Sequence, residues 1–253
     1  MDVESFVRGV VGVFLPQKQV DGATGRLRAG KYLEQYTIGL LRKQHAHADE
    51  GSYFTCGNNQ SGIATPAVTA FATTTPGWLI VNTNTAASGL RIYIDYLNLV
   101  TTVAGGWASA GVNTQIMVYI DQVNRYSSGG TDLSANFVNT STGSSLTPGC
   151  KFYAGAITAT AAQAQRAVAG FRILRPAVSA TVADVVGETK MMNFGGVEAM
   201  LNGTITVGSA NQISIPLPAI VLDPQSSCLI YYVMNGTTPS AASFVPELGI
   251  IQR

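Results

Sequence analysis

Short runs of apolar, β-branched and aromatic residues recur from residue 91 to residue 251, separated by turn-forming clusters. The clusters include SSGGTD (127–132), NTSTGSSLTPG (139–149), DPQSS (223–227) and NGTTPS (235–240). A spacing of roughly ten residues between turns is typical of a sandwich or barrel. The runs are RIYIDYLNLV (91–100), TQIMVYID (114–121), KFYAGAITA (151–159), AGFRILRP (169–176), TKMMNFGG (189–196), LNGTITVG (201–208), NQISIPLP (211–218), SCLIYYVM (227–234) and SFVPELGII (243–251).

This pattern predicts an all-β body, an antiparallel β-sandwich of jelly-roll type with about eight to ten strands. No alternation of strands with helices is present, which disfavours a doubly wound sheet. The run 91–100 is apolar on both faces, which is typical of a strand covered on both sides. The prolines in IPLPAIVLDP (215–224) are expected at sheet edges or strand starts, because proline cannot donate a ladder hydrogen bond.

Helix signals are weak. The stretch AQAQRAVAG (162–170) is consistent with a single turn or a short helix that Gly170 closes. The stretch DVESFVRGVVGVF (2–14) has an amphipathic pattern but contains two glycines, each of which costs about 1 kcal/mol in a helix. The stretch KYLEQYTIGLLRK (31–43) fits a helical stripe and strand alternation equally well, so both assignments stay open.

Charge divides the chain into two parts. Charged residues make up only 11% of the chain and its formal net charge is +1. Residues 1–50 carry both histidines, six acidic residues and seven of the fifteen basic residues: Arg8, Lys18, Arg26, Arg28, Lys31, Arg42 and Lys43. We therefore predict an N-terminal arm over residues 1–50, partly extended or helical, and a sandwich body over residues 51–253. A charge-poor body can pack against copies of itself with little desolvation of ions.

The arm contains GRLRAGKY (25–32), which has the glycine and lysine spacing of a phosphate-binding loop. Such a loop follows a buried strand and places Ser or Thr after its lysine, but here Tyr32 follows Lys31 and the preceding residues are polar. We interpret the stretch as a segment that reaches from one subunit to the next and binds it. We predict inter-subunit contacts for five basic residues: Arg26, Arg28, Lys31, Arg42 and Lys43. The near balance of charge in the arm disfavours direct binding of nucleic acid.

Residues with catalytic or metal-binding chemistry are few. In a strand, His45, His47 and Asp49 would point the same way, as metal ligands can, but no fourth ligand is evident and no metal is predicted. The body has no histidine and no GxSxG motif, and the placement of Asp95, Asp121 and Asp132 relative to one another is open. We predict no enzymatic activity and no cofactor. Cys56, Cys150 and Cys228 are widely spaced and are expected to be small core residues.

Aromatic residues offer one surface candidate. Trp107 lies in the small-residue stretch AGGWASAG and is a candidate for an exposed contact with a glycan or a partner. The tyrosines within strand runs are expected to pack in the core: Tyr93, Tyr96, Tyr119, Tyr231 and Tyr232. No secretory signal is expected. No apolar segment approaches the about 20 residues that cross a membrane, so no membrane partner is predicted.

The whole chain resembles the virion proteins of tailed bacteriophages. The resemblance lies in the arm of about fifty residues, the junction KQHAHADEGSYF (43–54), the Thr/Ser/Ala/Gly-rich strands from RIYIDYLNLV onward and the ending SFVPELGIIQR. It implies a β-sandwich located in the virion that assembles as an oligomer, most often a trimer, with the major capsid protein among its partners. It supplies no catalytic residues.

Three functions follow as hypotheses. The first is a non-enzymatic head cement, decoration or shell protein whose arm clasps its neighbours. The second is a tail- or fibre-associated module that binds host glycan through exposed aromatics such as Trp107. The third is a polysaccharide-cleaving enzyme. The low charge of the body and the balanced charge of the arm favour the first, because both favour contacts between proteins.

Overall fold

The computed structural model describes residues 43–58, 61–66, 68, 70–105, 112–175, 185–195, 201–202, 212–235 and 241–253. The chain divides into two units, Met1–Lys43 and Gln44–Arg253. Apart from Lys43, all described residues belong to the second unit, so the predicted arm lies largely outside the described residues. The second unit is all-β, and the prediction of an antiparallel-rich body is confirmed.

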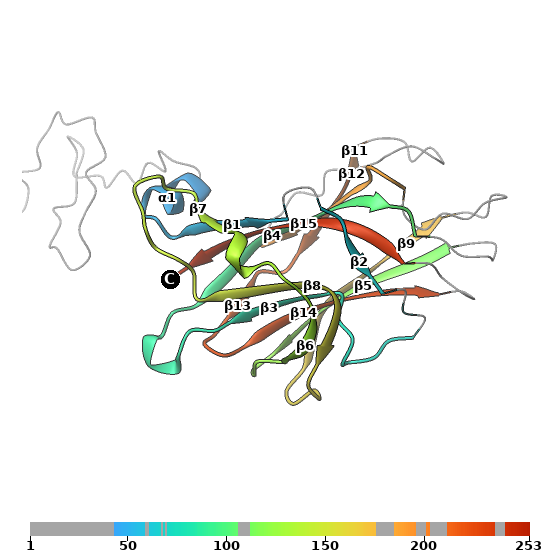
Figure 1. The fold of residues 1–253 in the computed structure, drawn as a ribbon, viewed down its shortest axis with the longest axis horizontal. Helices are drawn as coiled ribbons and strands as arrows, with labels where there is room; N and C mark the ends of the chain where they lie inside the picture. Colours follow the sequence, from blue (N-terminus) through green and yellow to red (C-terminus); the bar gives the residue numbers. More distant parts are fainter. Residues whose placement is uncertain are drawn as a thin grey trace, which may run out of the picture. The chain divides into compact units, whose positions relative to one another are not determined.

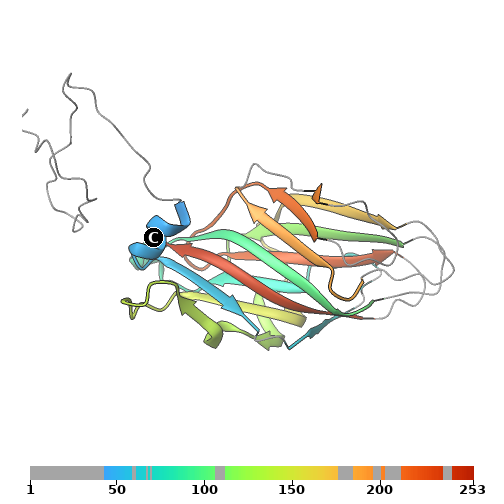
Figure 2. The same ribbon diagram turned by 90° about the horizontal axis from the view of Figure 1, so that it is seen from above.

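Two sheets form the body and lie as two layers (Figure 1). The nine-stranded sheet has the order β11 (Leu201–Asn202), β12 (Gln212–Leu217), β10 (Thr189–Phe194), β4 (Ile92–Val103), β15 (Ala242–Gln252), β1 (Tyr53–Gly57) and β7 (Phe137–Asn139). Two short strands complete it: β13 (Ile220–Leu222) pairs with β4, and β2 (Ile63–Thr65) pairs with β15. In Figure 2, β15 runs between β4 and β1.

The six-stranded sheet has the order β6 (Tyr126–Asp132), β8 (Cys150–Ala159), β3 (Trp78–Asn82), β14 (Ser227–Asn235), β5 (Val112–Asp121) and β9 (Arg166–Arg175). All pairs of named strands are antiparallel except β10 and β12, which run parallel. The α-helix α1 (Lys43–Asp49) precedes β1, and two 3₁₀ turns, η2 (Ala86–Ser88) and η3 (Ser134–Asn136), lie between strands.

The main hydrophobic core fills the space between the two sheets. Alternate residues of each strand point inward because side chains alternate across a strand with a period of two. From β4 these are Ile92, Ile94, Leu97 and Leu99, and from β5 they are Ile116 and Val118. The three cysteines are buried and unbridged, as predicted. Burial raises the pKa of the Cys56 and Cys228 thiols to about 12.

One end of the interior also holds a buried ion pair. Lys190 Nζ lies 3.0 Å from Glu188 Oε1 and 5.2 Å from the centre of the Phe244 ring. Both charged side chains are fully buried. Because each charge is paired with the other, the cost of removing both from water is offset, and the interior is otherwise apolar.

The strand predictions are confirmed for most runs and wrong at three places. β9 begins at Arg166, so the part of 162–170 that could have been helical is a strand from that residue on. The predicted turn SSGGTD belongs to β6, which pairs with β8 through two register shifts. Gly129 and Gly130 adopt positive φ values of 75° and 71° there, which only glycine adopts readily. β4 is buried on one face and half-exposed on the other, not covered on both.

Proline placement follows the prediction in part. Pro216 lies in β12, beyond the short stretch that pairs with β11, so that side of the strand is an edge among the described residues. Pro246 lies within the central strand β15, at the gap between the pairing with β2, which ends at Phe244, and the pairing with β1, which begins at Glu247. A residue that cannot donate a ladder bond is tolerated at such a gap.

We predict that Phe244→Ala lowers the free energy of unfolding by about 3–5 kcal/mol, because it opens a cavity in the main core. The Phe244 ring is fully buried, with its centroid 5.5 Å from those of both Trp78 and Tyr232. Urea denaturation measures the change. Val138→Ala is the control, because Val138 is 62% exposed and its truncation should cost less than about 0.5 kcal/mol. Equal effects of the two substitutions would contradict the assignment of this core.

Candidate functional site

Most residues predicted to make contacts lie outside the described residues. These are Arg26, Arg28, Lys31 and Arg42 in the arm, and Trp107 in the body. Lys43 is the first residue of α1, and its side chain is not described. These six residues therefore stay predictions, and the candidate site is built from side chains that the structure places.

The segment with the two histidines is helical, not extended. Residues two positions apart on a helix point about 200° apart, so the common direction expected from a strand is lost. His47 is buried and its Nδ1 lies 3.5 Å from Glu50 Oε2, whereas His45 is exposed. The described residues contain no group of three or more His, Cys, Asp or Glu side chains that could hold a metal ion.

The three body carboxylates considered for catalysis lie in separate polar networks. Asp95 accepts a hydrogen bond from Tyr53, and Asp121 pairs with Arg125. Asp132 accepts bonds from Ser134 and lies 3.5 Å from Lys151. Each therefore has its own local partner, and none of these contacts joins two of the carboxylates.

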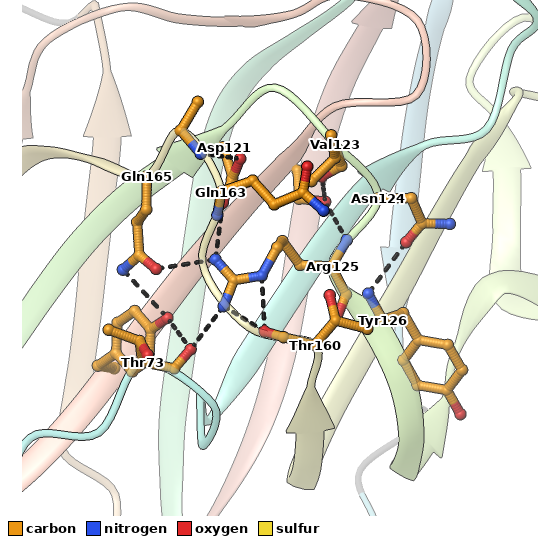
Figure 3. A network of polar contacts seen from close by, with 12 residues as sticks. Thr73, Asp121, Val123, Asn124, Arg125, Tyr126, Thr160, Gln163 and Gln165 are labelled. Atoms are coloured by element: carbon orange, nitrogen blue, oxygen red, sulfur yellow. Dashed lines mark hydrogen bonds and ion pairs between the residues drawn. The ribbon is translucent and has the colours of Figure 1, made fainter.

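A buried guanidinium organises one end of the six-stranded sheet (Figure 3). The Arg125 side chain is 0% exposed, and its Nη1 donates to Asp121 Oδ2 at 2.7 Å and to Gln165 Oε1 at 2.8 Å. Its Nη2 donates to the carbonyl oxygen of Thr73 at 2.9 Å, and its Nε donates to that of Thr160 at 2.9 Å. One side chain thus ties together the loop before β3, the turn after β5 and the loop before β9.

The Asp121 carboxylate is held on both oxygens. Besides Arg125, it accepts backbone N–H bonds from Gln163 at 3.2 Å and Ala164 at 3.1 Å. Burial alone would raise the pKa of this carboxyl, but the hydrogen bonds from Arg125 and the two backbone groups outweigh burial and lower it. Asp121 therefore stays ionised at neutral pH and serves as the permanent counter-ion of Arg125.

The loops held by Arg125 help to cover the outer face of the six-stranded sheet. A second apolar cluster lies on that face, made of Leu79, Val81, Tyr153, Ile157, Ala159, Leu229 and Tyr231. The ring of Phe71, from the loop before β3, stacks on Tyr119 at 5.3 Å and meets Tyr231 edge-on at 4.9 Å. The Tyr231 hydroxyl donates to the Thr73 carbonyl oxygen at 2.8 Å. This outer face is therefore a second small core.

The outer face of the nine-stranded sheet is different. It presents Tyr53 from β1, Asp95, Tyr96 and Asn98 from β4, and Glu247 from β15, the group that we name the tyrosine–carboxylate face. The Tyr53 hydroxyl donates to Asp95 Oδ2 at 2.8 Å, and the Tyr96 hydroxyl donates to Glu247 Oε1 at 2.9 Å. The prediction that Tyr96 packs in the core is wrong: it and Tyr93 lie half-buried on this face, whereas Tyr231 and Tyr232 are buried.

A bulge in β4 creates this face. In the pairing with β15, Gly249 is opposite Tyr96 and Ile250 is opposite Ile94, so Asp95 is the extra residue. An inserted residue shifts the inward–outward alternation by one. Ile94 and Leu97 therefore both point inward, and Asp95 and Tyr96 both remain on the outer side.

Gly249 leaves room for the two tyrosines. A Cβ atom at this position would lie 2.6 Å from Tyr96 Cδ1 and 2.9 Å from the Tyr53 hydroxyl oxygen. Burial, followed by the neighbouring carboxylates, raises the pKa of both tyrosine hydroxyls well above its ordinary value. Both hydroxyls thus keep their protons at neutral pH and remain donors to the carboxylates.

The charges of this face have no cationic partner among the described side chains. Neither Asp95 nor Glu247 forms an ion pair there; their hydrogen-bond donors are the tyrosines. Asn98 is directly opposite Glu247 in the pairing of β4 with β15, and its buried Oδ1 has no hydrogen-bond partner in the described part of the chain. The face is therefore rich in acceptors and carries net negative charge.

A hollow of ≈ 210 Å³ lies between the end of β5 and the loop after β13. It presents the exposed Arg166, together with Asp223, which Arg91 Nε already contacts at 2.8 Å. The described part of the chain includes no helix long and apolar enough to span a bilayer.

No protein-family model, curated protein or solved structure matches this chain. The candidate site therefore rests on the geometry of the two outer sheet faces. Tyr53, Glu247, Gly249 and Arg125 were not singled out from the sequence. Ile92 and Ile94 are two positions apart, whereas Ile94 and Leu97 are three positions apart, and this spacing of the inward residues of β4 was the one signal of the bulge.

We predict that Arg125→Met destabilises the protein by about 3–5 kcal/mol, because it leaves the buried Asp121 carboxylate without its counter-ion. Guanidinium denaturation at pH 7 measures the change. Arg91→Met is the matched control, because Arg91 and Asp223 form a pair whose side chains are 56% and 68% exposed, and losing it should cost at most about 1 kcal/mol. A loss for Arg125→Met no larger than that of the control would contradict the proposed role.

We predict that Gly249→Ala lowers the free energy of unfolding by about 1–3 kcal/mol, because the new methyl group crowds the rings of Tyr96 and Tyr53. Thermal and urea unfolding measure the loss. Gly57→Ala in β1 of the same sheet is the control, because a Cβ added at Gly57 meets nothing within 4 Å. If both substitutions are neutral, the tyrosine rings do not depend on the glycine.

Proposed function

We propose that the chain is a non-enzymatic structural protein of a bacteriophage virion. It assembles as an oligomer, a trimer in the simplest case, on the particle as head cement, decoration or shell component. Its partners are copies of itself and other virion proteins such as the major capsid protein. The N-terminal arm clasps neighbouring subunits, and neither nucleic acid nor membrane takes part.

The strand order carries the proposal and supports a sandwich of jelly-roll type. Strands β1-β15-β4-β10 are neighbours in one sheet, and strands β3-β14-β5-β9 are neighbours in the other. Among these eight strands, taken in chain order, the chain changes sheet from β1 to β3, β3 to β4, β4 to β5, β9 to β10, β10 to β14 and β14 to β15. Two interleaved Greek keys of this kind define the jelly roll, an architecture common in viral capsid proteins.

Composition supports the same proposal. The chain has 11% charged residues, less than half of the about 25% usual in soluble domains. Many of the surface charges that the structure describes are neutralised within the subunit, as in the pairs Arg91–Asp223, Lys151–Asp132 and Arg253–Glu50. A surface with few free charges can be buried against another protein at a low desolvation cost.

We predict that the recombinant chain is a stable oligomer and is a constituent of purified particles. Light scattering coupled to size-exclusion chromatography measures the oligomer, and quantitative mass spectrometry of virions counts the copies. Since virion components follow particle symmetry, hundreds of copies indicate the head, and about a dozen indicate the tail or neck. A chain that is monomeric at all concentrations and absent from particles would refute the proposal.

A further inference from the structure

The tyrosine–carboxylate face differs from the rest of the described surface in its charge. Three surface carboxylates have a cation within reach: Glu50 and Arg253 at 2.7 Å, Asp132 and Lys151 at 3.5 Å, and Asp223 and Arg91 at 2.8 Å. Among the described residues, Asp95 and Glu247 have only tyrosine hydroxyls as donors. The face therefore holds two negative charges that the described part of the subunit does not neutralise.

We propose that the basic segment 25–32 of one copy docks on the tyrosine–carboxylate face of a neighbouring copy. This inference rests on the proposed function, and it assigns the surface that the arm meets. Arg26 and Arg28 pair with Asp95 and Glu247, and Lys31 adds a third positive charge. The occupant is a segment of this same protein.

The chemistry of the two surfaces is complementary. The segment GRLRAGKY carries three basic residues and no acidic residue. A guanidinium group offers five donors in a planar fork, which suits carboxylates, and it also stacks on aromatic rings. The face offers the exposed Glu247 carboxylate, the half-buried Asp95 carboxylate and the half-buried ring of Tyr96.

Docking of the face on the same face of a second copy fits less well. Such a contact brings Asp95 and Glu247 of one copy against the same carboxylates of the other, and like charges in an interface are costly. The described cations offer few alternatives, because Arg91, Arg125, Lys151, Lys190 and Arg253 all lie in ion pairs within the subunit. The exposed Arg166 belongs to β9, in the other sheet.

The chain length permits this contact. Lys31 and Lys43 are twelve positions apart, and an extended chain of that length reaches up to roughly 40 Å. α1 leads directly into β1, the strand that carries Tyr53. The segment can therefore extend from the body of one subunit to a neighbour.

Charge exchange in the full-length chain tests the proposal. The face variant carries Asp95→Lys and Glu247→Lys, and the arm variant carries Arg26→Glu, Arg28→Glu and Lys31→Glu. Each is expected to weaken assembly about tenfold or more, because it sets like charges against each other. The variant with all five substitutions is expected to regain assembly, which damage to folding cannot explain. Analytical ultracentrifugation over a concentration series measures the dissociation constant.

Mixing the two variants identifies the copy that each arm meets. The arm variant has an acidic segment and an acidic face, whereas the face variant has a basic segment and a basic face. Each variant assembles weakly alone, but in a mixture a segment meets a face of opposite charge wherever unlike copies are neighbours, so the mixture should assemble more tightly than either variant alone. In a ring of three copies, two of the three contacts are then matched. If the variant with all five substitutions is rescued and the mixture assembles no more tightly than either variant alone, the arm binds its own subunit and the proposal is overturned.

Two controls separate this proposal from others. Asp223→Lys moves half of the face variant's charge change, +2 in place of +4, to a surface outside the face and should leave assembly unchanged. Asp95→Asn with Glu247→Gln removes the charges with little change in shape and should weaken assembly less than the lysine variant. If the wild type assembles and both face variants assemble equally well, this inference fails and the proposed function stands. If the wild type neither assembles nor joins particles, the proposed function fails with it.

Discussion

The hydrogen bonds of the Arg125 guanidinium determine which outer surface of the sandwich is closed. A charged group without exposed surface is tolerated only when its donors are satisfied, and here Asp121, Gln165 and two backbone carbonyl groups accept them. The carbonyl groups belong to Thr73 and Thr160, in loops that the network thereby fixes in place. The loop before β3 carries Phe71 onto Tyr119 and Tyr231. One buried charge thus holds the loops that cover the outer face of the six-stranded sheet.

The outer face of the nine-stranded sheet has a different structure. No comparable aromatic lid is found over it in the described part of the chain, and its central strand pair carries tyrosines bonded to carboxylates. A bulge at Asp95 and a glycine opposite Tyr96 produce this arrangement, and both act locally. The two faces of the body therefore have different roles. One is largely covered by loops of its own subunit, and the other keeps the carboxylates of Asp95 and Glu247 at the surface.

The sequence predicted the class of fold because apolar runs bounded by turn-forming clusters are a local property. The runs 114–121 and 227–234 are of this kind, and their strands lie where expected. β6 could not be predicted from SSGGTD, because its pairing with β8 depends on two glycines at positive φ and on a partner strand far along the chain. The Arg125 network was equally hidden, since its acceptors include backbone carbonyl groups 52 and 35 residues away. Spacing in a sequence does not reveal which carbonyl groups a fold leaves without a strand partner.

The bulge in β4 explains why Tyr96 lies on the outer face of the sheet and not in the core. Tyr93 and Tyr96 were assigned to the core because aromatic residues in a strand usually pack there. The inward set Ile92, Ile94, Leu97 and Leu99 skips one extra position between Ile94 and Leu97, and that skip changes which residues point outward. Had the alternation been unbroken, Asp95 and Leu97 would lie on the same face as Tyr93, and Tyr96 would face the interior with Ile94. The extra residue thus keeps a carboxylate and a phenol together on the outside. It gives this sheet an acidic, aromatic surface in a protein that carries seven of its fifteen basic residues in the arm.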